Sequence, residues 1–176
     1  VPAPGFLPAL AQWCTDNGKR LIYASSAATY GDGSAGFDDD PSCEALGKLH
    51  PLNAYGWSKH VVDRRIARLR RQGKPLPPQC VGLKFFNVYG PNEYHKGSMV
   101  SVVKVKYDEL VAGHPARLFR SGVEGLADGS QARDFIWVGD VIDVLLWLLE
   151  SPEVNGLFNL GTGTARTSVR RSPPLP

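Results

Sequence analysis

The chain has 176 residues, 43% of them hydrophobic, and a formal net charge of +3, which is enough apolar material for one core of ordinary domain size. Its Lys and Arg residues are scattered, which argues against nucleic-acid and membrane-surface partners, and no apolar run approaches the roughly 20 residues of a membrane span. The three cysteines, Cys14, Cys43 and Cys80, are too widely spaced for a disulfide framework or a zinc site, so we expect a cytoplasmic protein without metal.

The first half of the chain alternates helical and extended patterns. An amphipathic stretch ends before Asn17-Gly18, a common helix C-terminus, and a second, longer one ends before a Gly/Pro-rich break. The predicted elements are a helix over 7–16, a strand over 20–24, a Gly-rich loop over 25–36, an irregular segment over 37–50, a helix over 53–71, a strand over 80–85 and a turn over 87–91.

The second half continues the alternation. The predicted elements are a helix over 98–113, a strand over 117–119, a polar loop over 122–132, an extended segment over 134–138, a helix over 140–150 and a strand over 156–160. Strands that alternate with helices in this way predict an α/β fold with a parallel sheet.

One helical segment carries a pair of residues with a chemical use. Tyr55 and Lys59 lie four residues apart, so they share one face of the predicted helix. A free phenol is a poor base at neutral pH, but an ammonium group beside it stabilises the phenolate and lets it exchange a proton with a hydroxyl group. Taken alone, the pair is also an ordinary exposed helix contact.

The segment upstream gives this pair a context. Ser26 follows a predicted buried strand, and ligands bind parallel sheets at the carboxyl ends of the strands. A serine hydroxyl there can hydrogen-bond the reacting oxygen and hold it for Tyr55. The alternative is a turn of small residues that serves packing.

Four blocks in this order resemble the extended short-chain dehydrogenase/reductase superfamily. They are Ser-Ser-Ala-Ala-Thr-Tyr-Gly at 25–31 after a strand, Tyr-x-x-x-Lys at 55–59, Phe-Phe-Asn-Val-Tyr-Gly-Pro at 85–91 and Arg-Asp-Phe-Ile-Trp-Val-Gly-Asp-Val at 133–141. Within the superfamily, His-Lys-Gly-Ser-Met at 95–99 and Phe-Asn-Leu-Gly-Thr-Gly at 158–163 are similar to ADP-L-glycero-D-manno-heptose 6-epimerases. The resemblance covers residues 9–166.

This resemblance implies an α/β fold with a partial Rossmann-like parallel sheet and part of a small C-terminal substrate domain. Residues 1–90 would be the C-terminal part of a dinucleotide-binding domain. Residues 91–165 would be substrate-binding segments that return to the sheet, and residues 166–176 an irregular tail left by truncation or a frameshift.

The resemblance also implies the activity: NADP-dependent epimerisation of ADP-glycero-manno-heptose at C6, by oxidation to a 6-ketone and re-reduction. NAD remains an alternative cofactor, since the residue that reads the ribose 2′-position is not in the sequence, and a homo-oligomer is expected. The alternatives are another nucleotide-sugar epimerase, dehydratase or reductase on the same scaffold, and a truncated product without function.

The resemblance assigns roles to single residues. The expected catalytic residues are Tyr55, Lys96, Lys59 and Ser26. Cofactor contacts are expected from Lys59, Val88 and Lys96. Substrate contacts are expected from Asn87, Ser98, Lys104, Phe119, Arg120, Ser121 and Arg133. Lys104 falls where some members of the family have His.

Two of these roles have competing explanations. Inversion of a carbinol carbon needs a proton donor or acceptor in each of two substrate orientations, which Tyr55 and Lys96 can supply, but Lys96 also suits a phosphate contact ahead of a helix. Arg133 suits a diphosphate, which a guanidinium group binds with two hydrogen bonds, but it also suits a structural pair with Asp134.

One expected motif is not in the sequence. No Gly-x-x-Gly-x-x-Gly follows a predicted strand, and that turn with its helix N-terminus forms the pyrophosphate site of such enzymes. We therefore expect the isolated chain to bind a dinucleotide poorly and to be unstable or inactive by itself.

Overall fold

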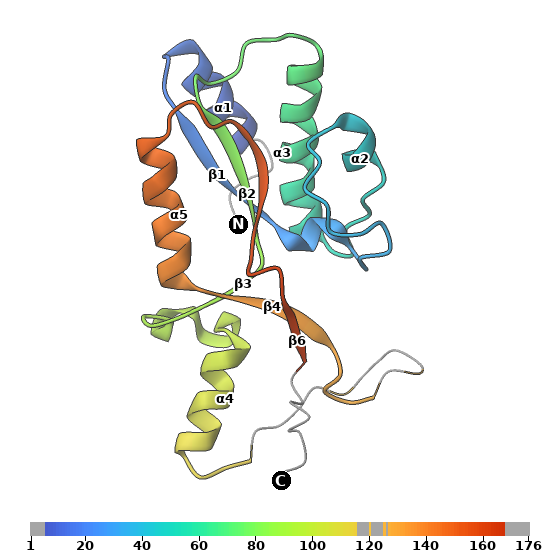
Figure 1. Ribbon diagram of the computed structural model, residues 1–176, viewed down its shortest axis with the longest axis vertical. Coiled ribbons are helices and arrows are strands. Elements are labelled where there is room, and N and C mark those ends of the chain that lie inside the picture. The colour runs from blue at the N-terminus through green and yellow to red at the C-terminus, as the bar shows by residue number, and fades with distance from the viewer. Residues whose placement is uncertain (1–5, 116–119, 121–124, 126, 168–176) are drawn as a thin grey trace. The chain divides into compact units, whose positions relative to one another are not determined.

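The computed structural model describes residues 6–115, 120, 125 and 127–167 (Figure 1). The chain forms two compact units, one of Val1–Phe86 with Asp143–Leu160 and the other of Asn87–Ile142 with Gly161–Pro176. The division expected from the sequence, with boundaries after residues 90 and 165, stays a prediction.

A three-stranded parallel sheet forms the centre of the first unit. Its order is β1 (Leu21–Ser26), β2 (Cys80–Phe85) and β5 (Gly156–Leu160). Five of the six residues of the central strand are buried, as expected for a parallel strand that is covered on both faces. The predicted α/β fold with a parallel sheet is therefore confirmed.

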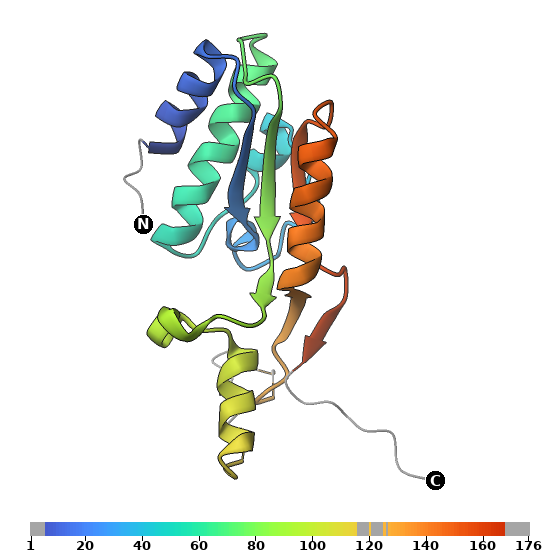
Figure 2. The ribbon, with the colours of Figure 1, turned by 90° about the vertical axis from the view of Figure 1, so that its left-hand side faces the viewer.

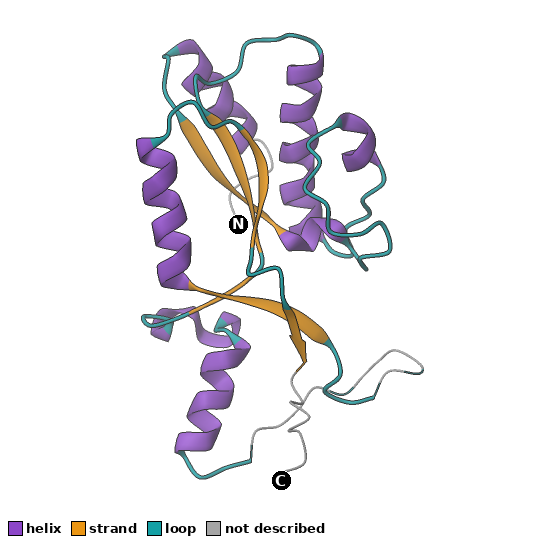
Figure 3. Ribbon diagram, in the orientation of Figure 1, coloured by secondary structure: helices purple, strands orange, loops and turns teal. Residues whose placement is uncertain are grey.

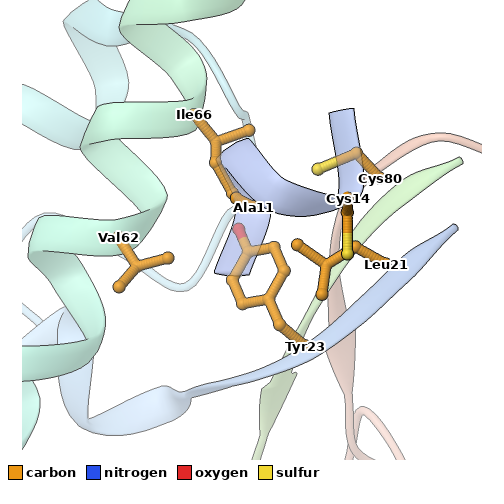
Figure 4. Packing of buried hydrophobic residues seen from close by; sticks show 7 residues of the cluster. All are labelled: Ala11, Cys14, Leu21, Tyr23, Val62, Ile66 and Cys80. Atoms are coloured by element: carbon orange, nitrogen blue, oxygen red, sulfur yellow. The ribbon is translucent and has the colours of Figure 1, made fainter. Parts of the chain in front are cut away.

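Helices cover this sheet on both faces. Figure 2 shows α1 (Phe6–Asp16) and α3 (Ala54–Arg71) on one side of it, and α5 (Val138–Glu150), whose residues from Asp143 belong to this unit, on the other. Side chains from α1, β1, α3 and β2 meet in one apolar cluster (Figure 4). It consists of Ala11, Cys14, Leu21, Tyr23, Val62, Ile66 and Cys80. A fully buried Leu or Ile side chain contributes about 1.5–3 kcal/mol relative to an exposed one, so this cluster fixes α3 against β1.

Two short helices occur where the sequence predicts loops. The predicted loop over 25–36 is wrong at its start, because β1 pairs with β2 as far as Ser26 and η1 (Ala27–Tyr30) follows directly. The predicted irregular segment over 37–50 contains α2 (Cys43–Gly47), which the Ser42 side chain caps. A helix of five residues is too short to show a helical period in the sequence.

The second unit contains short strands, shown in orange in Figure 3. Strand β4 (Ala132–Trp137) pairs in parallel with β3 (Asn87–Tyr89) and in antiparallel with β6 (Ala165–Thr167). Two predictions are therefore wrong. The segment over 87–91, predicted as a turn, begins with strand β3. The tail predicted to be irregular from residue 166 begins with the last two residues of strand β6. The predicted strand over 117–119, part of the predicted loop over 122–132 and the tail from 168 lie outside the described residues.

Two helical segments complete the second unit. The predicted helix over 98–113 is a 3-10 segment, η2 (Tyr94–Met99), followed by α4 (Val102–Val111), which the Ser101 side chain caps. Helix α5 begins at Val138, two residues before its predicted start. Within the described part of the chain, none of the helices combines the length and the apolarity needed to cross a membrane.

Candidate active site

Ser26, Tyr55 and Lys59 belong to two elements that touch in the first unit. Ser26 ends β1, and its Oγ accepts a hydrogen bond from the Ala28 amide at 3.1 Å. Gly56 lies so close to η1 that a Cβ atom there would stand 2.7 Å from the Ala28 carbonyl oxygen. The start of α3 therefore packs directly on the segment that follows β1, at the carboxyl end of the sheet where α/β proteins bind ligands.

Lys59 connects the helix to the strand. Its Nζ donates to the Ala24 carbonyl oxygen at 2.9 Å and lies 5.7 Å from the centroid of the Tyr55 ring. An ammonium group has three donors, so two remain for a ligand once one is bound to the strand. The Tyr55 side chain is 48% exposed, which leaves its phenol accessible from solvent.

A buried polar cluster lies below these residues, and it was not predicted from the sequence. Asp63 accepts hydrogen bonds from the Ser25 hydroxyl at 2.6 Å and the Tyr23 hydroxyl at 3.1 Å. Lys84 Nζ lies 3.7 Å from the Asp63 carboxylate and donates to Thr29 Oγ1 at 2.6 Å. The cluster therefore joins β1, η1, α3 and β2 through charged and hydroxyl groups.

The two charged residues of this cluster are almost fully buried. Burial raises the pKa of Asp63 and lowers the pKa of Lys84, because both charged forms lose water. The hydrogen bond from Ser25 and the charge of Lys84 act in the opposite direction on Asp63, and the charge of Asp63 does so on Lys84. The sequence carried a weak signal for this pair, since Lys84 interrupts an otherwise apolar buried strand.

His60 is a second buried polar residue on α3. Its ring packs edge-on against Trp57, and neither ring nitrogen has a hydrogen-bond partner among the residues that the structure describes. Burial, together with the nearby charges of Lys84 and Arg64, lowers the pKa of His60 from 6.5 to about 4. The imidazole of His60 is therefore neutral in the folded chain at neutral pH.

This depressed pKa makes stability depend on pH. The unfolded chain takes up a proton at His60 below pH 6.5 and the folded chain does so only near pH 4, so the contribution is complete above pH 6.5 and is lost on acidification towards pH 4. We expect the free energy of unfolding to fall by about 2 kcal/mol between pH 7 and pH 5. Urea titrations at the two pH values check this.

The matched variants are His60→Phe, which keeps a ring against Trp57, and His114→Gln, which changes an exposed histidine. The loss of stability on acidification should be absent in His60→Phe and persist in His114→Gln. An equal dependence in His60→Phe would show that other groups cause it.

In the second unit, Lys96 is held by a buried carboxylate. Lys96 Nζ lies 3.1 Å from Glu93 Oε2, and Glu93 also accepts hydrogen bonds from the Ser101 amide, the Ser101 hydroxyl and the Gly90 amide. Burial alone would raise the pKa of Glu93, but these hydrogen bonds lower it to about 2. Glu93 therefore stays ionised at neutral pH and fixes the place of the Lys96 amine. Nothing in the sequence patterns pointed to this residue.

The other expected contact residues of the second unit have varied surroundings. Asn87 donates to the Asp134 carbonyl oxygen at 2.8 Å, next to Val88 on β3. Lys104 is paired with Asp108 and lies over the Tyr94 ring, 5.4 Å from its centroid. The Arg120 carbonyl oxygen accepts from Gln131 at 3.3 Å. Phe119, Ser121 and the side chain of Ser98 lie outside what the structure describes.

Arg133 is exposed on β4, opposite Arg166 on β6. The structural pair with Asp134 is not among the ion pairs of the described residues. The Asp134 carboxylate instead accepts hydrogen bonds from Thr162 and Gly163 at 2.8–2.9 Å. Like charges opposite each other on neighbouring strands repel. The described residues contain no group of three or more His, Cys, Asp or Glu side chains suited to a metal ion.

Comparison with protein families places most of the chain in one of them. Residues 8–161 match the model of the NAD dependent epimerase/dehydratase family. The chain is 51% identical over 158 residues to the ADP-L-glycero-D-manno-heptose-6-epimerase of Nitratidesulfovibrio vulgaris, covering 90% of this chain and 47% of the relative. It is 46% identical over 163 residues to the enzyme of that name from Fusobacterium nucleatum, covering 93% and 48%.

Solved structures agree with these relatives. The ADP-L-glycero-D-manno-heptose-6-epimerase of Helicobacter pylori superposes with a TM-score of 0.65 at 28% identity, over 93% of this chain and 46% of that one. The UDP-glucose 4-epimerase of Thermus thermophilus, solved with NAD, gives 0.64 at 26% identity, over 92% and 49%. The chain spans about half the length of the curated relatives it matches.

Proposed function

Because the chain belongs to the NAD dependent epimerase/dehydratase family, we propose that its residues carry out the C6 epimerisation of an ADP-glycero-manno-heptose, with NADP as cofactor. The observation that carries the proposal is the bond from Lys59 to the Ala24 carbonyl oxygen, which fixes an ammonium group beside the accessible Tyr55 phenol at the end of β1. The 6-epimerase names of the relatives support the choice of sugar.

The residues present suit one end of a dinucleotide. Two free donors on Lys59 can bind the hydroxyls of the nicotinamide ribose, and we propose Val88 and Lys96 as further contacts. The sequence lacks the Gly-rich turn that would cradle the pyrophosphate. When bound, the nicotinamide would supply the hydride acceptor and donor for C6 of the sugar. NADP rather than NAD, the cytoplasmic location and a homo-oligomer stay predictions.

The side chains of the first unit can move the hydroxyl proton. Ser26 Oγ accepts from the Ala28 amide, so its own hydrogen can be donated to the substrate oxygen and hold it. Tyr55, as phenolate, takes the proton of the C6 hydroxyl while the carbon becomes a ketone, and the Lys59 ammonium stabilises the phenolate charge.

A second proton donor is needed because the ketone is reduced from its other face. We propose Lys96 for this role, with its amine fixed by the ionised Glu93 carboxylate at 3.1 Å. A phosphate contact is the competing role of Lys96. Arg133 would bind the substrate diphosphate, with Asn87, Ser98, Lys104, Phe119, Arg120 and Ser121 as the other proposed substrate contacts.

Epimerisation of ADP-heptose in deuterated water tests the reaction. The chain is assayed both alone and fused to the parts of the Nitratidesulfovibrio vulgaris relative that it does not cover, since the match spans 47% of that relative. Proton NMR should show the inverted C6 centre with its hydrogen retained, because the hydride never exchanges with water. Deuterium at C6 would contradict the oxidation–reduction route.

The same assay separates the alternatives. A 4-epimerase would convert UDP-glucose and leave ADP-heptose unchanged, and a dehydratase would release water from a nucleotide sugar. Ala27 and Ala28 stand where a dehydratase needs an acidic pair after the serine. Failure of both proteins on every substrate would favour a product without function. The near-ultraviolet absorbance of reduced NADP, retained by the fusion and not by the chain alone, checks the expected cofactor loss.

A further inference from the structure

Two parts of the proposed site meet above the buried polar cluster. Ser26 ends β1, and Lys59 lies on α3 one turn before Asp63. Asp63 and Lys84 are both buried, and the parallel register places Lys84 opposite Ser25. Lys84 therefore lies opposite the residue that precedes Ser26 on β1, and Asp63 lies one helical turn after Lys59 on α3.

A chain of hydrogen bonds runs from this pair to Ser26. Lys84 Nζ donates to Thr29 Oγ1 at 2.6 Å, and Thr29 Oγ1 donates to the Ser26 carbonyl oxygen at 2.8 Å. From the other side, the Ser25 hydroxyl donates to Asp63 at 2.6 Å. The Tyr30 ring lies against the ammonium group, 4.3 Å from Nζ to the centroid.

We infer that Asp63 and Lys84 are positioning residues for Ser26. Through Ser25 and Thr29 they hold the end of β1 in one conformation and fix it to the helix that carries the tyrosine and the lysine of the proposed site. The expected effect on activity rests on the role proposed for Ser26. The positioning of Ser26 does not rest on that role, because it can be measured without turnover.

The chemistry of the cluster favours positioning over mere stability. A buried ion pair loses so much hydration that apolar residues of equal size often stabilise a fold as well or better. Apolar side chains in place of Asp63 and Lys84 could fill the same space. They could not orient the Thr29 hydroxyl towards the Ser26 carbonyl oxygen, because only a hydrogen bond has the direction to do so. The adjacent core cluster of α1, β1 and α3 already supplies apolar packing.

Amide hydrogen exchange in the full chain tests this inference with Thr29→Val and Thr29→Ser. The Ala28 amide, which is bound to Ser26 Oγ, should exchange about tenfold faster in Thr29→Val, because the hydroxyl that restrains Ser26 is gone. Thr29→Ser keeps the hydroxyl and should stay within about twofold of the unmodified chain. The Leu83 amide in β2 serves as the reference for global opening.

Thr15 provides a matched control, since its hydroxyl also donates to a backbone carbonyl, that of Ala11 in α1, at 2.9 Å. Thr15→Val should leave Ala28 exchange unchanged. Equal Ala28 protection in Thr29→Val and the unmodified chain would overturn the inference, as would equal acceleration in Thr29→Ser.

The unmodified chain gives a test that needs no folded variant. A Lys84 ammonium held in this way should show a slowly exchanging proton signal with contacts to the Thr29 side chain, and a fast-exchanging signal would contradict the arrangement. In an active fusion protein, Thr29→Val should lower kcat about tenfold with little change in KM. If the fusion shows no turnover while exchange behaves as expected, the proposed function fails and the positioning stands.

Discussion

Tyr55→Phe should lower the turnover of ADP-heptose by at least about 100-fold, with KM nearly unchanged, because the variant keeps the ring and loses only the group that exchanges the proton. The position of Lys59 should survive the change, since its bond to the Ala24 carbonyl oxygen does not involve the phenol. Steady-state kinetics of the fusion protein measure both constants.

Tyr107→Phe is the control for this variant. Tyr107 is an exposed tyrosine on α4, and it has no part in the proposed chemistry. Its loss of the hydroxyl should change turnover by less than about twofold. A loss under about threefold in Tyr55→Phe would remove Tyr55 from the proton-transfer role.

The part of the site that could be predicted from the sequence is local. Tyr55 and Lys59 are one helical turn apart, and Ser26 comes at the end of an apolar strand. All three could therefore be identified from their positions along the chain. The start of α3 was also predictable, because Asn53 is a good capping residue and its side chain accepts from the Gly56 amide at 2.8 Å. Such residues can be identified from the sequence because residues close to them in the chain determine where they lie.

The buried cluster depends on pairings between distant residues. Lys84 comes opposite Ser25 only through the register of β1 and β2, and Asp63 reaches both from a helix. No spacing rule links the three positions. The short strands β3 and β6 were missed for a related reason: three residues show no alternation, and their pairing with β4 depends on tertiary structure.

Lys84→Met should destabilise the first unit by roughly 3–5 kcal/mol, because it leaves the Asp63 carboxylate buried without its counter-charge. Both side chains of the pair are fully buried, so solvent screening does not weaken the effect. Lys48→Met is the surface control, since its partner Glu44 is exposed and the pair spans one helical turn. That change should cost at most about 0.5 kcal/mol. Urea unfolding at neutral pH measures both.

The double variant Lys84→Met with Asp63→Asn separates stability from positioning. It removes both charges and keeps an acceptor for the Ser25 and Tyr23 hydroxyls, so we expect it to be more stable than the sum of the single variants predicts, by about 1–3 kcal/mol. Purely additive losses would mean that the two residues do not act as a pair. Recovered stability together with fast Ala28 exchange is the expected combination, because an apolar substitute can restore packing energy and cannot donate to Thr29.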